Sequence, residues 1–172
     1  MSQHTELRVE QGTQVLLSAS SMDRPIRRLA AIAEGPLLVV SSKSPSEVAA
    51  ELSAGGADLS TAAHIPISGA EVSYDGPMWV CDPIVPDDLT GLSMRLSRAF
   101  ASLADGDACL VVENLNVFLM YAAEDRVFRF FDHVTTNARD HGITGVYTLV
   151  ADAVAEDTTA RLRASVDTEL GD

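Results

Sequence analysis

The sequence predicts an α/β domain in which a parallel sheet carries helices on both faces. Short apolar runs, each about the length of one buried strand, alternate along the chain with stretches whose apolar residues recur at helical spacing. The chain has 172 residues and an apolar content of 47%, enough to bury the core of one domain. We therefore predict a single domain over residues 1–172, with residues 1–8 flexible.

The alternation gives an order of elements along the chain. The expected core strands lie within 9–18, 36–41, 77–81, 109–112 and 143–150, with a short edge strand at 63–68. The expected helices cover 24–33, 44–52, about 89 to 103, 123–140 and 156–164. Residues 166–170 either extend the last helix or form a final strand.

Glycines and prolines place the ends of several elements. Gly12 predicts a turn before the first strand, and Gly142 ends the helix that carries the apolar stripe Val127, Phe130, Phe131, Val134 and Ala138. Pro66 restricts residues 63–68 to the edge of the sheet, because a proline cannot donate to a neighbouring strand. The first helix begins at Pro25, with three residues that can cap it, Ser20, Ser21 and Asp23.

The net charge is strongly acidic. Twenty-five Asp and Glu residues against twelve Lys and Arg residues give a formal charge of −13 at pH 7, and Lys43 is the only lysine. Such a surface repels phosphate backbones, which disfavours nucleic-acid binding. Acid excess with scarce lysine is typical of a salt-loaded cytoplasm, where screening removes most of the self-repulsion. The sequence shows no signal peptide and no membrane-spanning stretch, so we expect a cytoplasmic protein without membrane contact.

The apolar run Cys109–Val112 ends in the carboxylate Glu113. A strand that delivers an acid to the carboxyl edge of a parallel sheet is the Walker B arrangement, in which the acid acts on magnesium. This short pattern has low specificity, because any buried strand must end in something polar. The alternative role of Glu113 is to accept hydrogen bonds from neighbouring loop N–H groups.

The segment after the first strand departs from a phosphate-binding loop. The functional pattern is G-x-x-x-x-G-K-[ST], and this chain has Ser-Ala-Ser-Ser-Met-Asp-Arg-Pro at residues 18–25. Ser18 and Asp23 replace glycines, and Asp23 adds negative charge where phosphates would lie. Arg24 replaces the lysine, while Pro25 replaces the magnesium-binding hydroxyl and removes a backbone N–H. We therefore expect a helix start here, with no nucleotide cofactor and no bound metal.

Four segments carry a family resemblance, namely GTQVLLS at 12–18 and the blocks at 67–92, 110–139 and 148–162. Through them the stretch from about Gly12 to Leu170 resembles a haloarchaeal family of small RecA/KaiC-like proteins, many with an eroded phosphate loop. The resemblance implies a three-layer RecA-type sheet with the first and fourth strands adjacent. It implies no activity, because fold does not fix function.

Other candidate residues have alternative structural roles. In RecA-type ATPases a carboxylate near the end of the third strand can activate water, and Asp82 holds that position, although Asp82-Pro83 also suits a turn. Two arginine clusters, at 24–28 and at 95–98, either form ion pairs with nearby acids or form a phosphate- or DNA-binding patch. The apolar residues 117–121 and Phe128 form either an assembly surface or part of a helix buried within one subunit.

Together these observations predict a RecA/KaiC-like domain without ATPase activity. We expect a regulatory or scaffolding protein that acts through contacts with a protein partner or with further copies of itself. One alternative is a weak or unconventional ATP-binding ATPase that uses Arg24, Asp82 and Glu113, with Glu113 as the metal ligand. A second alternative is a DNA-associated regulator that uses the arginine clusters, which the charge of −13 opposes.

Overall fold

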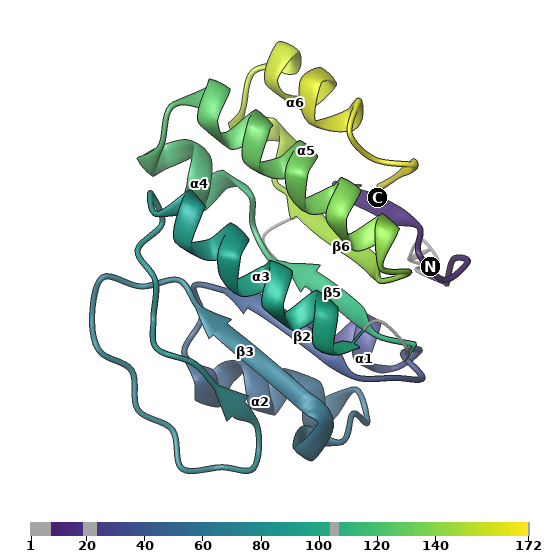
Figure 1. Ribbon diagram of the computed structural model, residues 1–172, viewed down its shortest axis with the longest axis vertical. Coiled ribbons are helices and arrows are strands. Elements are labelled where there is room, and N and C mark those ends of the chain that lie inside the picture. The colour runs from purple at the N-terminus through teal and green to yellow at the C-terminus, as the bar shows by residue number, and fades with distance from the viewer. Residues whose placement is uncertain (1–7, 19–23, 104–106, 172) are drawn as a thin grey trace.

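In the part of the chain that the structure describes, seven parallel strands form one sheet in the order β4-β3-β2-β5-β6-β1-β7 (Figure 1). The computed structural model describes residues 8–18, 24–103 and 107–171. The strands are β1 (Gln14–Ser18), β2 (Leu37–Ser41), β3 (Ala62–Pro66), β4 (Trp79–Val80), β5 (Cys109–Val112), β6 (Thr144–Leu149) and β7 (Thr168–Gly171).

Helices cover both faces of this sheet, which confirms the predicted α/β class. One face carries α1 (Pro25–Ala30) and α2 (Pro45–Ala54). The other carries α3 (Leu89–Leu103), α4 (Asn116–Tyr121), α5 (Glu124–Asp140) and α6 (Glu156–Arg163). Two short 3-10 helices, η1 (Leu59–Thr61) and η2 (Ala151–Ala153), lie in connections. None of the helices in the described ranges is long and apolar enough to cross a membrane.

The alternation of side chains along the strands divides the core into two layers. In β1, Leu16 packs in the cluster that includes α3 and α5, whereas Val15 and Leu17 pack in the cluster that includes α1 and α2. All three residues have no exposed surface. A strand buried on both faces must be apolar at every position, which is why the core strands read as unbroken apolar runs.

Most of the predicted elements are present near their expected positions. The turn before β1 has Gly12 at φ +92°, and α5 ends before Gly142 at φ +69°, a backbone conformation that favours glycine. The final stretch forms β7 and does not extend α6. The proposed caps Ser20, Ser21 and Asp23 lie outside the described residues, as do residues 1–7 of the segment expected to be flexible.

The two strands nearest one edge of the sheet exchange the predicted roles. Residues 63–68 were expected at the edge, but β3 lies between β2 and β4, and the expected core strand at 77–81 contributes only the two-residue edge strand β4. The proline argument fails because Pro66 is the last residue of β3 and needs no N–H there. The following residue, Ile67, donates its N–H to Ser41 O at 3.0 Å.

The expected adjacency of the first and fourth strands is also wrong. The fourth predicted strand is β5, and β6 separates it from β1. Because β5 and β6 are consecutive parallel strands joined by the crossover through α4 and α5, they pair directly and leave β1 on the far side of β6.

The predicted apolar stripe of α5 is buried, and Phe128 beside it is covered within the subunit. Phe128 is 9% exposed, and the guanidinium carbon of Arg161 lies 4.1 Å from its ring centroid. Phe118 is also buried, at 2%, whereas Met120 and Tyr121 at the end of α4 are 75% and 61% exposed. The interpretation as a helix buried within one subunit therefore holds for Phe118 and Phe128, whereas Met120 and Tyr121 at the end of α4 present an apolar surface.

Candidate functional site

The candidate site lies where β2 and β5 end side by side at the carboxyl edge of the sheet. The backbone N–H of Glu113 donates to Val40 O at 2.9 Å, which continues the pairing of the two strands by one residue. The hydroxyl of Ser41, the last residue of β2, donates to Glu113 Oε1 at 2.8 Å. The two strands thus fix the position of the Glu113 carboxylate.

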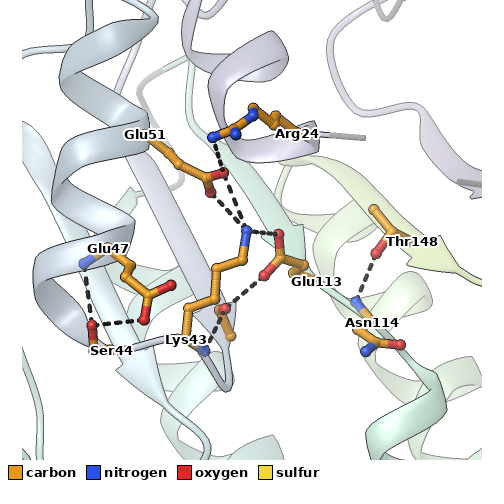
Figure 2. A network of polar contacts seen from close by, with 9 residues as sticks. Arg24, Lys43, Ser44, Glu47, Glu51, Glu113, Asn114 and Thr148 are labelled. Carbon is orange, nitrogen blue, oxygen red and sulfur yellow. Dashed lines mark hydrogen bonds and ion pairs between the residues drawn. The ribbon is translucent and has the colours of Figure 1, made fainter. Parts of the chain in front are cut away.

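Lys43 brings the only ammonium of a side chain in the protein to this carboxylate (Figure 2). Its Nζ lies 3.2 Å from Glu113 Oε2 and 3.1 Å from each carboxylate oxygen of Glu51. Its backbone N–H donates to Ser41 Oγ at 3.0 Å, so the same hydroxyl contacts both partners of the ion pair. We call Ser41, Lys43, Glu51 and Glu113 the edge cluster.

Helix α2 supplies the second carboxylate. Ser44 caps the helix by accepting a hydrogen bond from the Glu47 N–H at 3.2 Å, and Pro45 occupies the first helical position. Glu51 lies about one turn after Glu47, on the buried side of the helix with Val48 and Leu52. The cap therefore sets the helix phase that directs Glu51 to Lys43.

The edge cluster is largely removed from water. The side chains of Glu51 and Glu113 are 9% and 11% exposed, and that of Lys43 is 33% exposed. Burial alone lowers the pKa of Lys43, but its hydrogen bonds and the charges of Glu51 and Glu113 outweigh burial, so the pKa lies above the ordinary lysine value. Buried carboxylates are stable only when paired, and here one ammonium pairs with two of them.

The turn after Glu113 connects the edge cluster to β6. Asn114 has φ +70°, and its backbone N–H donates to Thr148 Oγ1 at 2.6 Å. The next N–H, of Leu115, donates to Thr148 O at 2.8 Å, and the Asn116 side chain bonds both backbone polar groups of Val150. A non-glycine residue in the left-handed region costs free energy that these hydrogen bonds offset.

A sequence model of a protein family matches residues 12–170, from the turn before β1 into β7, and so spans every element of this site. The chain belongs to the DUF7504 family. That family is described as one of unknown function, so membership assigns no activity. No curated protein matches the chain.

In this DUF7504 chain, the described residues of the altered phosphate loop lie at the end of β1 and at the start of α1. Ser18 is the last residue of β1, Arg24 precedes α1, and Pro25 is the buried first residue of that helix. The Arg24 guanidinium is 63% exposed and lies 3.9 Å from Glu51 Oε1, so it extends the edge cluster weakly. Asp23 lies outside the described residues.

These residues do not fit a magnesium–nucleotide complex. Magnesium requires oxygen ligands at about 2.1 Å in octahedral geometry, but an ammonium already lies between the two carboxylates that face this edge. Pro25 offers no N–H to a phosphate. Within the described ranges, no three His, Cys, Asp or Glu side chains are grouped as metal ligands.

Asp82 does not join the edge cluster. It is exposed and follows β4, and its backbone oxygen accepts a hydrogen bond from the Arg95 guanidinium. Strands β3 and β2 separate β4 from β5, which places the strand ends about 14 Å apart at the usual strand spacing. The two acids of the ATPase alternative, Asp82 and Glu113, therefore lie at different places along the sheet edge.

The sequence interpretation did not place three members of the edge cluster, Ser41, Lys43 and Glu51. Two signals were available. Glu51 stands between Val48 and Leu52 on the apolar side of its helix, a pattern that indicates a buried charge in need of a partner. The only lysine of the chain follows an apolar strand by two residues, and so was available as that partner.

Proposed function

We propose that this DUF7504 protein is a RecA/KaiC-like domain that does not hydrolyse ATP and acts as a regulator or scaffold through protein contacts. The proposal places it in the cytoplasm of a salt-loaded, haloarchaeal cell. The parallel α/β sheet and the acid at the end of β5 support a relation to nucleotide-hydrolysing domains.

The observation that carries the proposal is the ion pair between Lys43 and Glu113. In a Walker B site the acid acts on magnesium, whereas here an ammonium of the protein itself lies 3.2 Å from the carboxylate. A divalent cation would have to displace Lys43 from two carboxylates that are about nine-tenths buried. Lys43 thus supplies the positive charge that an ATPase takes from its metal.

The segment that would hold the phosphates supports the same proposal. The Arg24 guanidinium lies near Glu51, and Pro25 opens a helix of only six residues without a side-chain cap. Arg24 keeps a positive charge at the described end of that segment, but Pro25 removes one of the backbone donors that a phosphate-binding loop offers.

Exposed apolar side chains support the protein-contact part of the proposal. Among the described residues, Trp79, Val85, Met94, Met120 and Tyr121 are large apolar residues with more than a third of their surface exposed. Exposed apolar patches are typical of contact surfaces.

Calorimetric titration of ATP and magnesium into the protein, in molar potassium chloride, tests the proposal. We expect no binding heat and no rise in melting temperature beyond those of magnesium chloride alone, which is the matched control. Micromolar binding, at about −8 kcal/mol, would contradict the proposal and favour the ATPase alternative. Salt-sensitive binding of duplex DNA would favour the DNA-associated alternative instead.

A further inference from the structure

The helix layer on one face of the sheet ends before the sheet does. Helices α6, α5 and α3 pack side by side across this face, and Figure 1 shows β3 and β4 extending beyond α3. On the opposite face α2 packs against β3. Among the described elements, no helix follows α3 over the last two strands, so one position in the layer is open.

An apolar groove of about 590 Å³ occupies this position. Its floor is formed by strand residues of β2 and β3, including Leu38, Ala63 and Ile65. One turn of α3 contributes Arg98 and Ala99, and the next contributes Ser102 and Leu103. With Arg95 one turn earlier, the wall spans nine residues of α3, or about 12 Å. We call this the edge groove.

Arginines border the edge groove without acidic partners. Within the described residues, no carboxylate lies within ion-pair distance of Arg95 or Arg98, although Asp82 also lines the groove. Arg95 donates to Cys81 Sγ at 3.3 Å and to the Asp82 carbonyl, which holds its guanidinium at the groove. The two arginines outnumber Asp82, the one acid among the residues that line the groove, so the groove is locally positive in a chain with twice as many acids as bases, and this indicates an acidic occupant.

Trp79 adds a large uncovered ring. It lines the edge groove from β4 and is 62% exposed. Tryptophan and arginine are the residues that most often dominate the free energy of protein–protein binding, and here both types border one groove.

We propose that the edge groove binds an amphipathic helix of a partner protein, with an apolar stripe flanked by carboxylates. The helix would take the open position in the layer, parallel to α3 at the usual interaxial distance of about 8–10 Å. Its stripe would cover Trp79 and the apolar floor, and its carboxylates would pair with Arg95 and Arg98. This inference rests on the proposed protein-contact function and names the class of partner.

A separate partner fits this groove better than a second copy of the chain does. A groove on one copy that receives a helix from another makes a head-to-tail contact, which closes only in special geometries and otherwise forms filaments.

The fluorescence of Trp79 provides a direct test, because it is the only tryptophan of the chain. The probe is an amidated peptide of about 15 residues, long enough to populate a helix, with a leucine stripe, flanking glutamates and no aromatic residue. We expect a blue shift of the emission as Trp79 leaves water. A control peptide with glutamine in place of glutamate should bind about fivefold more weakly.

Two variants locate the binding surface. Arg98→Glu should weaken binding of the glutamate peptide about tenfold, and Ala99→Phe should weaken it by filling the groove. Arg27→Glu is the matched control, since Arg27 is exposed on α1, on the opposite face, and has the same charge change. Circular dichroism verifies that each variant is folded.

Three outcomes would overturn the inference. They are the absence of a blue shift with the wild-type protein, equal binding of the two peptides, and an equal loss with Arg27→Glu and Arg98→Glu. Light scattering that shows self-association abolished by Ala99→Phe would assign the groove to a second copy. Binding of ATP in the calorimetric titration would contradict the proposed function but not the peptide-binding groove, because the fluorescence experiment does not depend on ATP binding.

Discussion

The edge cluster and the edge groove differ in whether their positively charged side chains form ion pairs. In the edge cluster, the only lysine contacts two carboxylates at 3.1–3.2 Å, and both carboxylates are about nine-tenths buried. In the edge groove, Arg95 and Arg98 have no ion-pair partner among the described residues. Removing a cation that is paired inside the fold destabilises it because its partners stay buried and charged, whereas a cation without an ion pair at a groove is available to another molecule.

The two regions also differ in how completely the sheet is covered. The edge cluster lies between β2, β5 and α2, where the helix packs over the neighbouring strand β3. The edge groove lies on the other face of β3, beyond the last helix of its layer. We therefore expect substitutions in the first region to change stability and substitutions in the second to change binding.

Among these substitutions, removal of the Lys43 ammonium should lower the free energy of unfolding the most. Lys43→Met leaves Glu51 and Glu113 facing each other without their ammonium, and we expect a loss of about 3 kcal/mol in the free energy of unfolding. Urea unfolding at constant potassium chloride measures it. Adding Glu51→Gln and Glu113→Gln to Lys43→Met should restore most of the lost stability. If Lys43→Met alone were as stable as the wild type, the edge cluster would not differ from the edge groove in its effect on stability.

A smaller effect is expected at the strained turn that follows Glu113. Asn114→Val should lower the free energy of unfolding by about 1–2 kcal/mol, because a β-branched residue disfavours φ +70°. Asn114→Gly should retain the wild-type stability, since glycine adopts this conformation freely. Equal losses in both variants, measured by thermal unfolding, would show that the side chain and not the backbone conformation matters.

The pH dependence of stability should contain a contribution from His64. This residue is fully buried beside the edge cluster, with Nε2 3.2 Å from Ser41 O, and burial lowers its pKa. A lowered folded-state pKa contributes stability that is complete above the unfolded value of about 6.5 and is lost as the pH falls below it. His64→Gln should therefore lose less stability than the wild type between pH 7 and pH 5, by about 1 kcal/mol.

The smallest expected effect on stability is at the edge groove. Arg98→Glu should change the free energy of unfolding by less than about 0.5 kcal/mol, because the side chain is exposed and unpaired within the described structure. Urea unfolding beside Arg27→Glu provides the comparison. A loss as large as that of Lys43→Met would remove the distinction between the two regions.

The sequence identified the elements of this fold because their signals are local. Each buried strand is an apolar run, and the acid after Cys109–Val112 indicates the carboxyl edge of the sheet. The order of the strands has no such local signal, since any two parallel strands can be neighbours. The roles of β3 and β4, and the place of β6 between β1 and β5, were therefore predicted wrongly.

The edge cluster was missed for the same reason. Lys43 and Glu113 are 70 positions apart and meet only because β2 and β5 are adjacent. Glu113 was identified by its own strand, whereas Lys43 and Glu51 become site residues only after the strand order is known. The edge groove depends in addition on where the helix layer stops, which follows from the packing of α3 and not from its sequence.

If Lys43 takes the place of a metal ion at Glu113, magnesium should not bind the edge cluster of the wild type, and the magnesium dependence of unfolding measures this. The midpoint of urea unfolding would be measured in magnesium chloride and in potassium chloride of equal ionic strength, for the wild type and for Lys43→Met. We expect no magnesium-specific change in the wild type and a raised midpoint in Lys43→Met, where the two carboxylates are free to bind the cation. A magnesium-specific rise in the wild type as large as that in the variant would contradict the account.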